Sequence, residues 1–306
     1  MKRNLIALVA GSALLFGIVW VLRPIAPKVM QVIPGPTVLV SKYTPVPIIV
    51  PQCSTVDVTV AVLGIDERDN NYIGFNTDAI WLVHFASNEI RVLSLPRDLV
   101  AAYPPGVGYE EQRVNWAWYL GDKHKYPDGG FGLLRDVLKV NWGITVDHYI
   151  LINFRAFVDT VDALGGIDVD VPEAIQDDQF PEDFGFNYQA INFEAGPQHM
   201  NGVEALRYAR IRHGDGDSER SERQKLLLEA LRAKATESWL ALPTVMANLA
   251  QSVRTDFMPD PACLTQPVRF ILIDDAAAPT VRETLGLVRR STPELFDPLI
   301  QDWLGK

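Results

Sequence analysis

The sequence predicts an α/β fold: an α-β-α sandwich around a central mixed sheet, preceded by one N-terminal transmembrane helix. Two observations carry this prediction. Apolar, β-branched runs that are typical of buried strands alternate with segments whose apolar residues recur at helical spacing, and this alternation is typical of α/β sandwiches. An uncharged apolar run also stands at the N-terminus, and its length matches the thickness of a bilayer.

The N-terminal apolar run covers residues 5–22 and follows Lys2 and Arg3. A helix of this length just crosses a bilayer, and Trp20 lies near its outer end, where aromatic anchors are common. We therefore predict a cytoplasmic stub and signal anchor over residues 1–22. The protein would be a single-pass protein of the cell membrane, with a cytoplasmic N-terminus and an extracytoplasmic body. The alternative is a cleaved signal peptide, although no clear small-residue cleavage site follows the run.

A proline-rich segment over residues 23–55 predicts an extended extracytoplasmic stalk. The chain has two cysteines, Cys53 before the predicted core and Cys263 after it. Disulfides persist outside the cytoplasm, so a Cys53–Cys263 bridge is favoured over two buried free thiols. The net charge of -10 and the pI near 5.0 argue against a nucleic-acid-binding protein.

The core domain is predicted over residues 56–258. Its strands are expected where β-branched and apolar residues cluster, at 56–65, 78–86, 90–95, 147–152 and 167–171. Helices are expected at 129–142, which Gly143 ends, and at 154–164, for which Asn153 is a typical N-cap.

The second half of the core is predicted to be mainly helical. Helices are expected at 200–208 with Asn201 as the cap, at 217–240 as a long amphipathic helix, and at 242–254. Residues 177–193 are acidic and aromatic without a clear period, which predicts a surface loop. A C-terminal extension over residues 259–306 contains a predicted strand within 264–274 and a predicted helix at 292–304.

Three charged residues stand at the ends of predicted strands, where ligands gather in α/β sheets. Asp66 ends the first strand, Asp78 opens the second, and Arg97 follows the third. Two carboxylates brought together by a hairpin-like return suit Mg²⁺, with water and phosphate completing its shell. Each aspartate alone is equally typical of an ordinary turn or cap.

The stretch 208–224 contains four arginines in an acidic chain. Arg210 and Arg212 are two apart, so in extended backbone they point to one face. Arg220, Arg223 and Gln224 share a face if the segment is helical. Converging guanidinium forks suit a phosphate or pyrophosphate. The alternative is a solvated surface helix with ion pairs.

Six segments of the chain resemble the LytR-CpsA-Psr family of membrane-anchored phosphotransferases in bacterial cell-wall assembly. They occur in the family's order over roughly residues 56–235. The segments are LGIDER (63–68), NTDAIWLVH (76–84), LSLPRD (93–98), RVNWAW (113–118), DHYILINFRAFVDTVDALGGIDVDVP (147–172) and GPQHMNGVEALRYARIRHGDGDSERSERQ (196–224).

The resemblance implies a phosphotransferase that attaches a glycopolymer to a hydroxyl of peptidoglycan. The glycopolymer would be a teichoic acid, a capsular polysaccharide or a similar polymer, carried on polyprenyl (undecaprenyl) pyrophosphate. The resemblance also implies that the sheet and helices enclose an apolar tunnel for the lipid. We expect its walls to include the helices at 129–142 and 153–164 and the strands at 78–85 and 147–152.

The resemblance also assigns roles to individual residues. Asp66 and Asp78 would hold Mg²⁺, and the catalytic set would be Asp66, Asp78, Arg97, Arg210 and Arg212. The pyrophosphate would be bound by Arg68, Arg97, Arg113, Arg210, Arg212, Asp217, Arg220 and Gln224. Phe75 and Glu219 depart from the family's pattern, and Glu219 adds negative charge beside the site. The alternative function is a polyprenyl (pyro)phosphate-binding protein or a pyrophosphatase without ligase activity.

Overall fold

The computed structural model describes most of the chain from residue 57 onward. The described residues are 57–65, 76–181, 187–211, 217–237, 253–257, 263 and 265–305, without the side chains of 217 and 218. All of them belong to one compact unit. The predicted anchor and stalk lie outside these residues, and no helix within the described ranges is long and apolar enough to cross a membrane.

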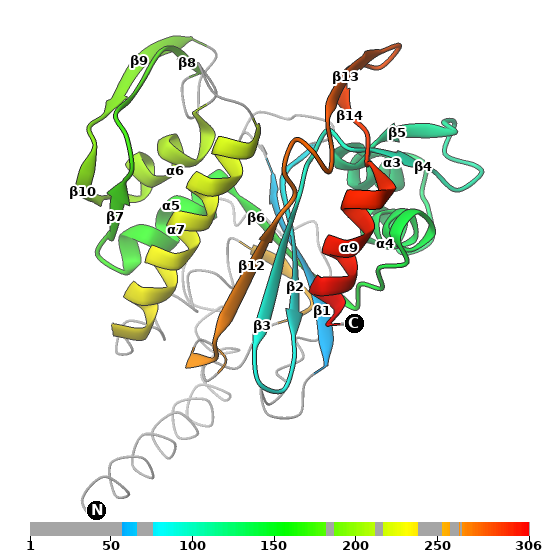
Figure 1. Ribbon diagram of the computed structural model, residues 1–306, viewed down its shortest axis with the longest axis horizontal. Coiled ribbons are helices and arrows are strands. Elements are labelled where there is room, and N and C mark those ends of the chain that lie inside the picture. Colours follow the sequence, from blue (N-terminus) through cyan, green and yellow to red (C-terminus); the bar gives the residue numbers. More distant parts are fainter. Residues whose placement is uncertain are drawn as a thin grey trace, which may run out of the picture. The chain divides into compact units, whose positions relative to one another are not determined.

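A six-stranded mixed sheet forms the centre of the fold (Figure 1). In sheet order the strands are β11 (Val253–Thr255), β6 (His148–Asn153), β1 (Val58–Ile65), β2 (Thr77–Phe85), β3 (Ile90–Leu95) and β12 (Val268–Leu272). The pairs β6–β1 and β3–β12 are parallel, and the other neighbours are antiparallel. The predicted mixed sheet is therefore confirmed.

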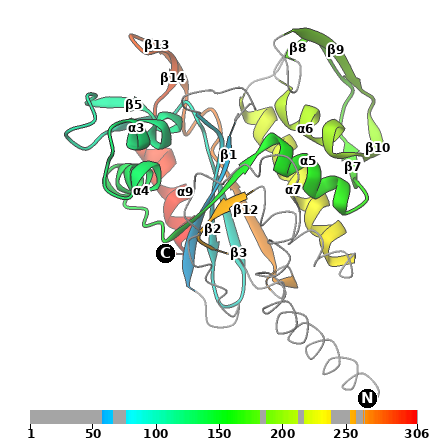
Figure 2. The same cartoon turned by 180° about the vertical axis from the view of Figure 1, so that it is seen from behind.

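Helices cover both faces of this sheet (Figures 1 and 2). One face carries α3 (Ala117–Lys123), α4 (Gly129–Trp142) and α9 (Pro293–Leu304), and the other carries α5 (Phe154–Ala163), α6 (Gly202–Arg210) and α7 (Asp217–Glu237). Alternate residues of β1 supply the two cores, because successive side chains of a strand point to opposite faces. Leu63 packs with α4, for example, whereas Val60 packs on the other side with Phe257. The α-β-α sandwich is confirmed.

Four two-stranded sheets accompany the central sheet. They are β4 (Val100–Ala102) with β5 (Glu111–Arg113), β7 (Ile167–Val171) with β10 (Gly196–Met200), β8 (Ile175–Pro181) with β9 (Tyr188–Phe193), and β13 (Thr280–Glu283) with β14 (Gly286–Arg289). A 3₁₀ turn, η2 (Val114–Trp116), follows β5.

The β8–β9 hairpin corrects the predicted surface loop at 177–193. Asp177 and Phe180 are buried, and the residues between and beside them are exposed. The pairing register shifts between Asp177 and Phe180, so the inward side chains are three apart rather than two. This irregularity hid the period of a strand in the sequence.

Capping residues define where the helices on the pocket side begin. The Asn153 side chain accepts a hydrogen bond from Ala156 N at 2.8 Å, as predicted for the start of α5. Asn201 and Glu204 form a reciprocal capping box, so α6 begins at Gly202, after β10 has ended at Met200.

Two predicted helix ends are wrong. The short helix continues past residue 208 to Arg210. The helix predicted to end at Arg254 does not reach that residue, because Arg254 pairs with Leu151 in the central sheet. Residues 242–252 of that prediction, and residues 238–240 of the predicted long helix, lie outside the described ranges.

The segment predicted as a C-terminal extension completes the sandwich. It supplies β12 at one edge of the sheet and α9 on one face. Trp303 is fully buried, its Nε1 donates to Arg91 O at 3.1 Å, and Arg91 Nη1 donates to Trp303 O at 2.7 Å. Cys263 is buried and disulfide-bonded, whereas its predicted partner Cys53 lies outside the described residues.

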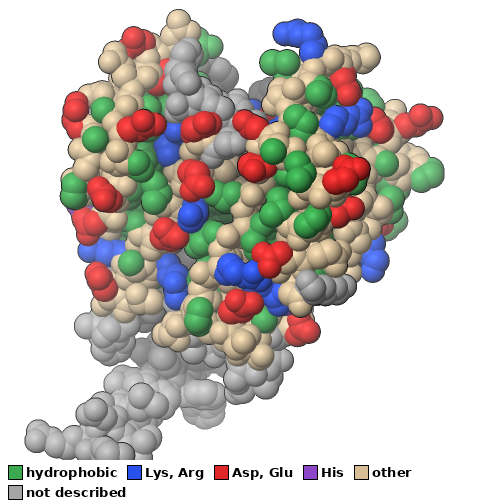
Figure 3. All heavy atoms as spheres, viewed as in Figure 1, with side chains coloured by type: hydrophobic (Ala, Val, Ile, Leu, Met, Phe, Trp, Pro, Cys, Tyr) green, Lys and Arg blue, Asp and Glu red, His purple; other side chains and the backbone are tan. Residues whose placement is uncertain are grey.

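Acidic and basic side chains are interspersed on the face of the molecule shown in Figure 3. Neither sign of charge dominates the described part of that face. The charged residues that matter for the site are instead gathered in a cavity within the sandwich.

Candidate active site

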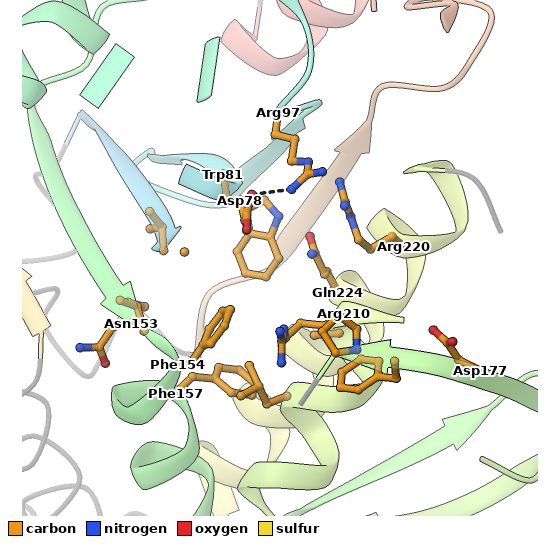
Figure 4. Close-up of a pocket in the computed structure, with 18 of the residues that line it drawn as sticks. Asp78, Trp81, Arg97, Asn153, Phe154, Phe157, Asp177, Arg210, Arg220 and Gln224 are labelled. Carbon is orange, nitrogen blue, oxygen red and sulfur yellow. Dashed lines mark hydrogen bonds and ion pairs between the residues drawn. The ribbon is translucent and has the colours of Figure 1, made fainter. Parts of the chain in front are cut away.

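A cavity of about 410 Å³ lies between the sheet and the α5–α6–α7 layer (Figure 4). Its volume falls in the usual range of ligand pockets. The residues lining it come from β1, β2, β6, β8, α5, α6, α7 and the turn after β3. They are Val62, Gly64, Asp78, Ala79, Trp81, Arg97, Ile152, Asn153, Phe154, Phe157, Asp177, Gln179, Phe180, Pro181, Leu206, Ala209, Arg210, Arg220 and Gln224.

Most of the pocket wall is apolar. Trp81 comes from the sheet and Phe157 from α5, and Figure 4 shows both among the residues that line the cavity. Gly64 and Ala79 pair across β1 and β2, and a Cβ added to Gly64 would lie 3.1 Å from the Ala79 Cβ. Small residues at this pair leave space above the sheet.

Asp78 enters the pocket through an irregularity in β2. Gly64 of β1 pairs with Ala79, but the next residue, Ile65, pairs with Thr77. Asp78 therefore has no partner in β1. The side chain of such a bulged residue points in a different direction from the one that the regular alternation of the strand would give it. Its carboxylate lines the pocket and is 36% exposed.

Arg97 forms an ion pair with this carboxylate. Arg97 lies in the turn after β3, and its Nη1 donates to Asp78 Oδ1 (Figure 4). Its Nε donates to Asp98 Oδ2 at 3.3 Å, which holds the base of the guanidinium. The Arg97 side chain is only 16% exposed, so its charge acts more strongly on a ligand than a freely solvated one would.

Arg210 reaches the pocket as the last residue of α6. The prediction that it lies in extended backbone is wrong, because the helix set up by the capping box continues through Arg210 and ends at Ile211. Its guanidinium carbon lies 4.4 Å from the centre of the Phe154 ring and 5.1 Å from that of the Phe180 ring. Figure 4 shows the side chain directed into the cavity.

Helix α7 brings Arg220 and Gln224 to the pocket, one turn apart on a common face. Arg220 is 8% exposed, and Figure 4 shows it opposite Arg97. Arg223 does not line the cavity. Its Nη2 donates instead to Ile211 O at 2.8 Å, and the residue is buried.

The remaining predicted site residues are Arg113, whose side chain is described, and four residues whose side chains are not. Arg113 lines no part of the cavity, because its Nη2 donates to Leu285 O at 2.6 Å and to Leu287 O at 3.2 Å. The side chains that lie outside the described part of the chain are Asp66, Arg68, Arg212 and Asp217. Asp66 directly follows Ile65, and Ile65 pairs with Thr77, the neighbour of Asp78 in β2.

Sequence reasoning missed several residues of the pocket. Asp177 and Phe180 lie on β8, in the segment expected to be a loop. Asp177 is 2% exposed, and its Oδ1 accepts a hydrogen bond from Gln179 N at 2.9 Å. A carboxylate surrounded by other acidic residues gives no sequence signal that it is the buried one.

The donor chemistry of the pocket fits Mg²⁺. This ion binds proteins through one or two carboxylates, with waters and substrate phosphates completing its shell. Asp78 supplies one such carboxylate inside the cavity. Within the described ranges no group of three or more His, Cys, Asp or Glu side chains is gathered as a metal site.

The family model of the LytR_cpsA_psr family matches residues 41–267, which is most of the chain. The chain belongs to the LytR_cpsA_psr family. The match includes every strand of the pocket and the helices α5, α6 and α7.

Curated relatives are similar over part of their length. An uncharacterized protein of Staphylococcus aureus is 34% identical over 188 residues, 59% of this chain and 43% of the relative. TagU of Halalkalibacterium halodurans, named a polyisoprenyl-teichoic acid–peptidoglycan teichoic acid transferase, is 30% identical over 208 residues, 66% of this chain and 62% of the relative. The chain thus matches about half the length of these LytR_cpsA_psr relatives.

Solved structures share the fold. TagV of B. subtilis superposes with a TM-score of 0.63 at 20% identity and covers 81% of this chain and 97% of its own. TagT bound to LIIa-WTA superposes with a TM-score of 0.59 at 23% identity, over 83% of this chain and 93% of its own. At these identities the likeness establishes the LytR_cpsA_psr fold.

Proposed function

We propose that this protein transfers a glycopolymer from a polyprenyl pyrophosphate carrier to a hydroxyl of peptidoglycan. The observation that carries the proposal is one cavity with an apolar wall and three arginines, Arg97, Arg210 and Arg220. An apolar surface suits the isoprenoid tail, and guanidinium forks suit the pyrophosphate. Relatives named teichoic acid transferases support the same reaction class.

The proposed reaction exchanges one phosphorus–oxygen bond for another. The acceptor oxygen attacks the phosphorus attached to the glycopolymer, and the bond from that phosphorus to the bridging oxygen breaks. Polyprenyl phosphate leaves with the bonding electron pair, and the hydroxyl proton passes to a nearby base or to water. The leaving phosphate gains charge in the transition state, and the arginines lower the barrier by neutralising it.

The described residues divide this work among them. Arg210 and Arg220 face the cavity from two helices and would bind the pyrophosphate oxygens, with Gln224 beside them. Arg97 bridges the aspartate and the cavity, so it would hold Asp78 and a phosphate oxygen together. Asp78, with Asp66, would hold Mg²⁺, which when bound supplies additional neutralisation of phosphate charge.

The proposal extends to the membrane. The polyprenyl carrier lies in the bilayer until the protein binds it, so the enzyme needs a position at the membrane surface. The apolar run at 5–22 would provide it as an uncleaved anchor with the catalytic unit outside the cytoplasm. Full-length protein should therefore remain in the membrane fraction after carbonate washing, and a soluble form that begins after about residue 25 would contradict the anchor.

The function is tested by mass balance with purified protein, a polyprenyl-pyrophosphate-linked glycopolymer and peptidoglycan fragments. Transfer predicts polyprenyl phosphate and a phosphodiester-linked polymer–peptidoglycan product in equal amounts. Release of polyprenyl phosphate with free polymer phosphate would identify a pyrophosphatase, and tight donor binding without release would identify a binding protein. Asp78→Asn should lower transfer and leave donor binding measurable.

A further inference from the structure

The Arg210 guanidinium lies against two aromatic rings. The Phe154 ring is centred 4.4 Å from the guanidinium carbon and the Phe180 ring 5.1 Å from it. The two rings come from different elements, the first residue of α5 and a strand residue of β8. No sequence pattern singles out either phenylalanine.

A guanidinium packed against two rings is restricted in a specific way. Its hydrogen-bond donors all lie in the plane of the group, so rings over its faces leave the donors directed outward at the edges. Each ring also attracts the cation, and more strongly where water is excluded. The lysine ammonium is a compact charge that has no plane to stack, so lysine does not reproduce this arrangement.

The supports of the two rings are rigid. Phe180 is fully buried in the core beneath the β8–β9 hairpin. Phe154 directly follows the capping residue Asn153, whose side chain fixes the first turn of α5. Helix α6 is in turn fixed against α5, because Asp162 Oδ1 accepts a hydrogen bond from Gly202 N at 2.7 Å. A Cβ at position 202 would lie 2.3 Å from Val158 O, so the two helices approach as closely as glycine allows.

We propose that Phe154 and Phe180 are positioning residues that clamp Arg210 in the orientation needed to grip a pyrophosphate. The clamp rests on the proposed function for its ligand, and it adds two residues that act through Arg210 rather than on the substrate. The fixed plane presents an edge with paired donors, which matches two oxygens of a phosphate group. The clamp thereby favours arginine over lysine at position 210.

The test is a double-mutant cycle read out as the affinity for inorganic pyrophosphate, measured by isothermal titration calorimetry in Mg²⁺ buffer. Phe154→Leu is the main variant, because Phe154 is only half-buried and leucine preserves an apolar side chain. It should weaken binding by about three- to thirtyfold, the range of one cation–π contact. Phe154→Tyr should retain most of the affinity because it retains the ring. In an Arg210→Ala background, Phe154→Leu should change the affinity less than twofold.

Two further variants separate positioning from folding. Phe180→Leu should repeat the result at the second ring. Phe193→Leu is the matched control, because Phe193 packs on Tyr208 of α6, the helix that carries Arg210, with ring centres 5.3 Å apart, but does not line the cavity. It should lower the thermal midpoint and leave the pyrophosphate affinity unchanged.

The outcomes distinguish the clamp from the proposed function. In one outcome the wild-type protein binds pyrophosphate, and Phe154→Leu lowers the affinity by the same factor whether or not Arg210 is present. That result would overturn the clamp and leave the proposed function standing. Wild-type protein that does not bind pyrophosphate would overturn both. If Phe154→Leu weakens pyrophosphate binding only while Arg210 is present, the clamp is supported whatever result the transfer assay gives.

Discussion

At the residue scale, Arg220 and Arg223 have different tasks although they are three positions apart on α7. Arg220 lines the cavity, whereas Arg223 is buried and donates to the carbonyl of Ile211, the residue that ends α6. Arg223 therefore ties the end of the Arg210 helix to α7. The spacing of the arginines alone does not reveal this division.

Arg223→Ala should lower the free energy of unfolding by about 1.5–3 kcal/mol, because it removes a buried hydrogen bond from a charged donor. Urea denaturation measures the change. Glu222→Ala is the matched control: Glu222 is exposed and pairs with Lys225 at 3.5 Å, so its loss should change the free energy of unfolding by less than about 0.5 kcal/mol. Equal losses in both variants would mean that the Arg223 contact does not stabilise the fold.

Asp78 illustrates what could be predicted from single residues and what could not. Its position at the start of a strand indicated a ligand site, and the structure places it in the cavity. The bulge that turns it there could not be predicted, because a register shift depends on how two strands pair and leaves no mark in local composition. Arg210 was placed in the wrong backbone state for a related reason. The capping box at Asn201 sets the start of α6, but only packing decides its last residue.

At the element scale, the contact between α5 and α6 positions both parts of the phosphate-binding wall. Helix α5 carries Phe154 and α6 carries Arg210, and the two helices meet at Gly202. The spacing of the helices therefore sets the distance between the ring and the guanidinium.

Gly202→Ala should destabilise the protein by about 1–3 kcal/mol, the usual cost of overpacking. An alanine Cβ would lie 2.3 Å from Val158 O, a backbone atom that cannot rotate away. The variant should also weaken pyrophosphate binding, since α6 must move away from α5. Thermal unfolding and calorimetric titration provide the two readouts, and unchanged values for both would contradict the close approach.

The helices were easier to predict than the β8–β9 hairpin for a physical reason. Caps and apolar periodicity are local signals, and they located α4, α5 and the start of α7. Most residues of β8 are exposed, and its two buried residues, Asp177 and Phe180, are separated by a register shift. Pocket residues on β8 were therefore missed, although the same residues close one wall of the cavity. Helix α4, expected to line the lipid tunnel, packs in the core on the face of the sheet away from the described cavity, and the tunnel itself stays a prediction.

At the scale of the whole molecule, the last forty residues belong to the sandwich. Strand β12 pairs with β3, and Trp303 of α9 is fully buried against Arg91 of the same strand. Alternation of strands and helices predicted the class of fold, but strand order depends on contacts between residues far apart in sequence. The strand predicted within 264–274 and the helix predicted at 292–304 are confirmed as β12 and α9, but local patterns could not predict that they complete the sandwich.

Trp303→Ala should destabilise the protein by about 3–5 kcal/mol, because it leaves a large cavity and an unsatisfied carbonyl at Arg91. Leu295→Ala on the same helix is the matched control, since Leu295 is 49% exposed and should cost less than about 0.5 kcal/mol. Chemical denaturation, monitored by far-ultraviolet circular dichroism rather than by tryptophan fluorescence, measures the free energy of unfolding of both variants. A small effect at Trp303 would mean that α9 is dispensable for the fold.

The central claim is that the arginines of the cavity neutralise a pyrophosphate during transfer. It is tested most directly by the initial rate of Mg²⁺-dependent polyprenyl phosphate release from a pyrophosphate-linked donor, compared between wild-type protein and Arg210→Ala. Each charge-assisted contact is worth about 1.5–3 kcal/mol, so the variant should be slower by roughly ten- to a hundredfold or more with its circular dichroism unchanged. Arg210→Lys should restore only part of the rate. Folded Arg210→Ala protein that releases polyprenyl phosphate at the wild-type rate would contradict the account.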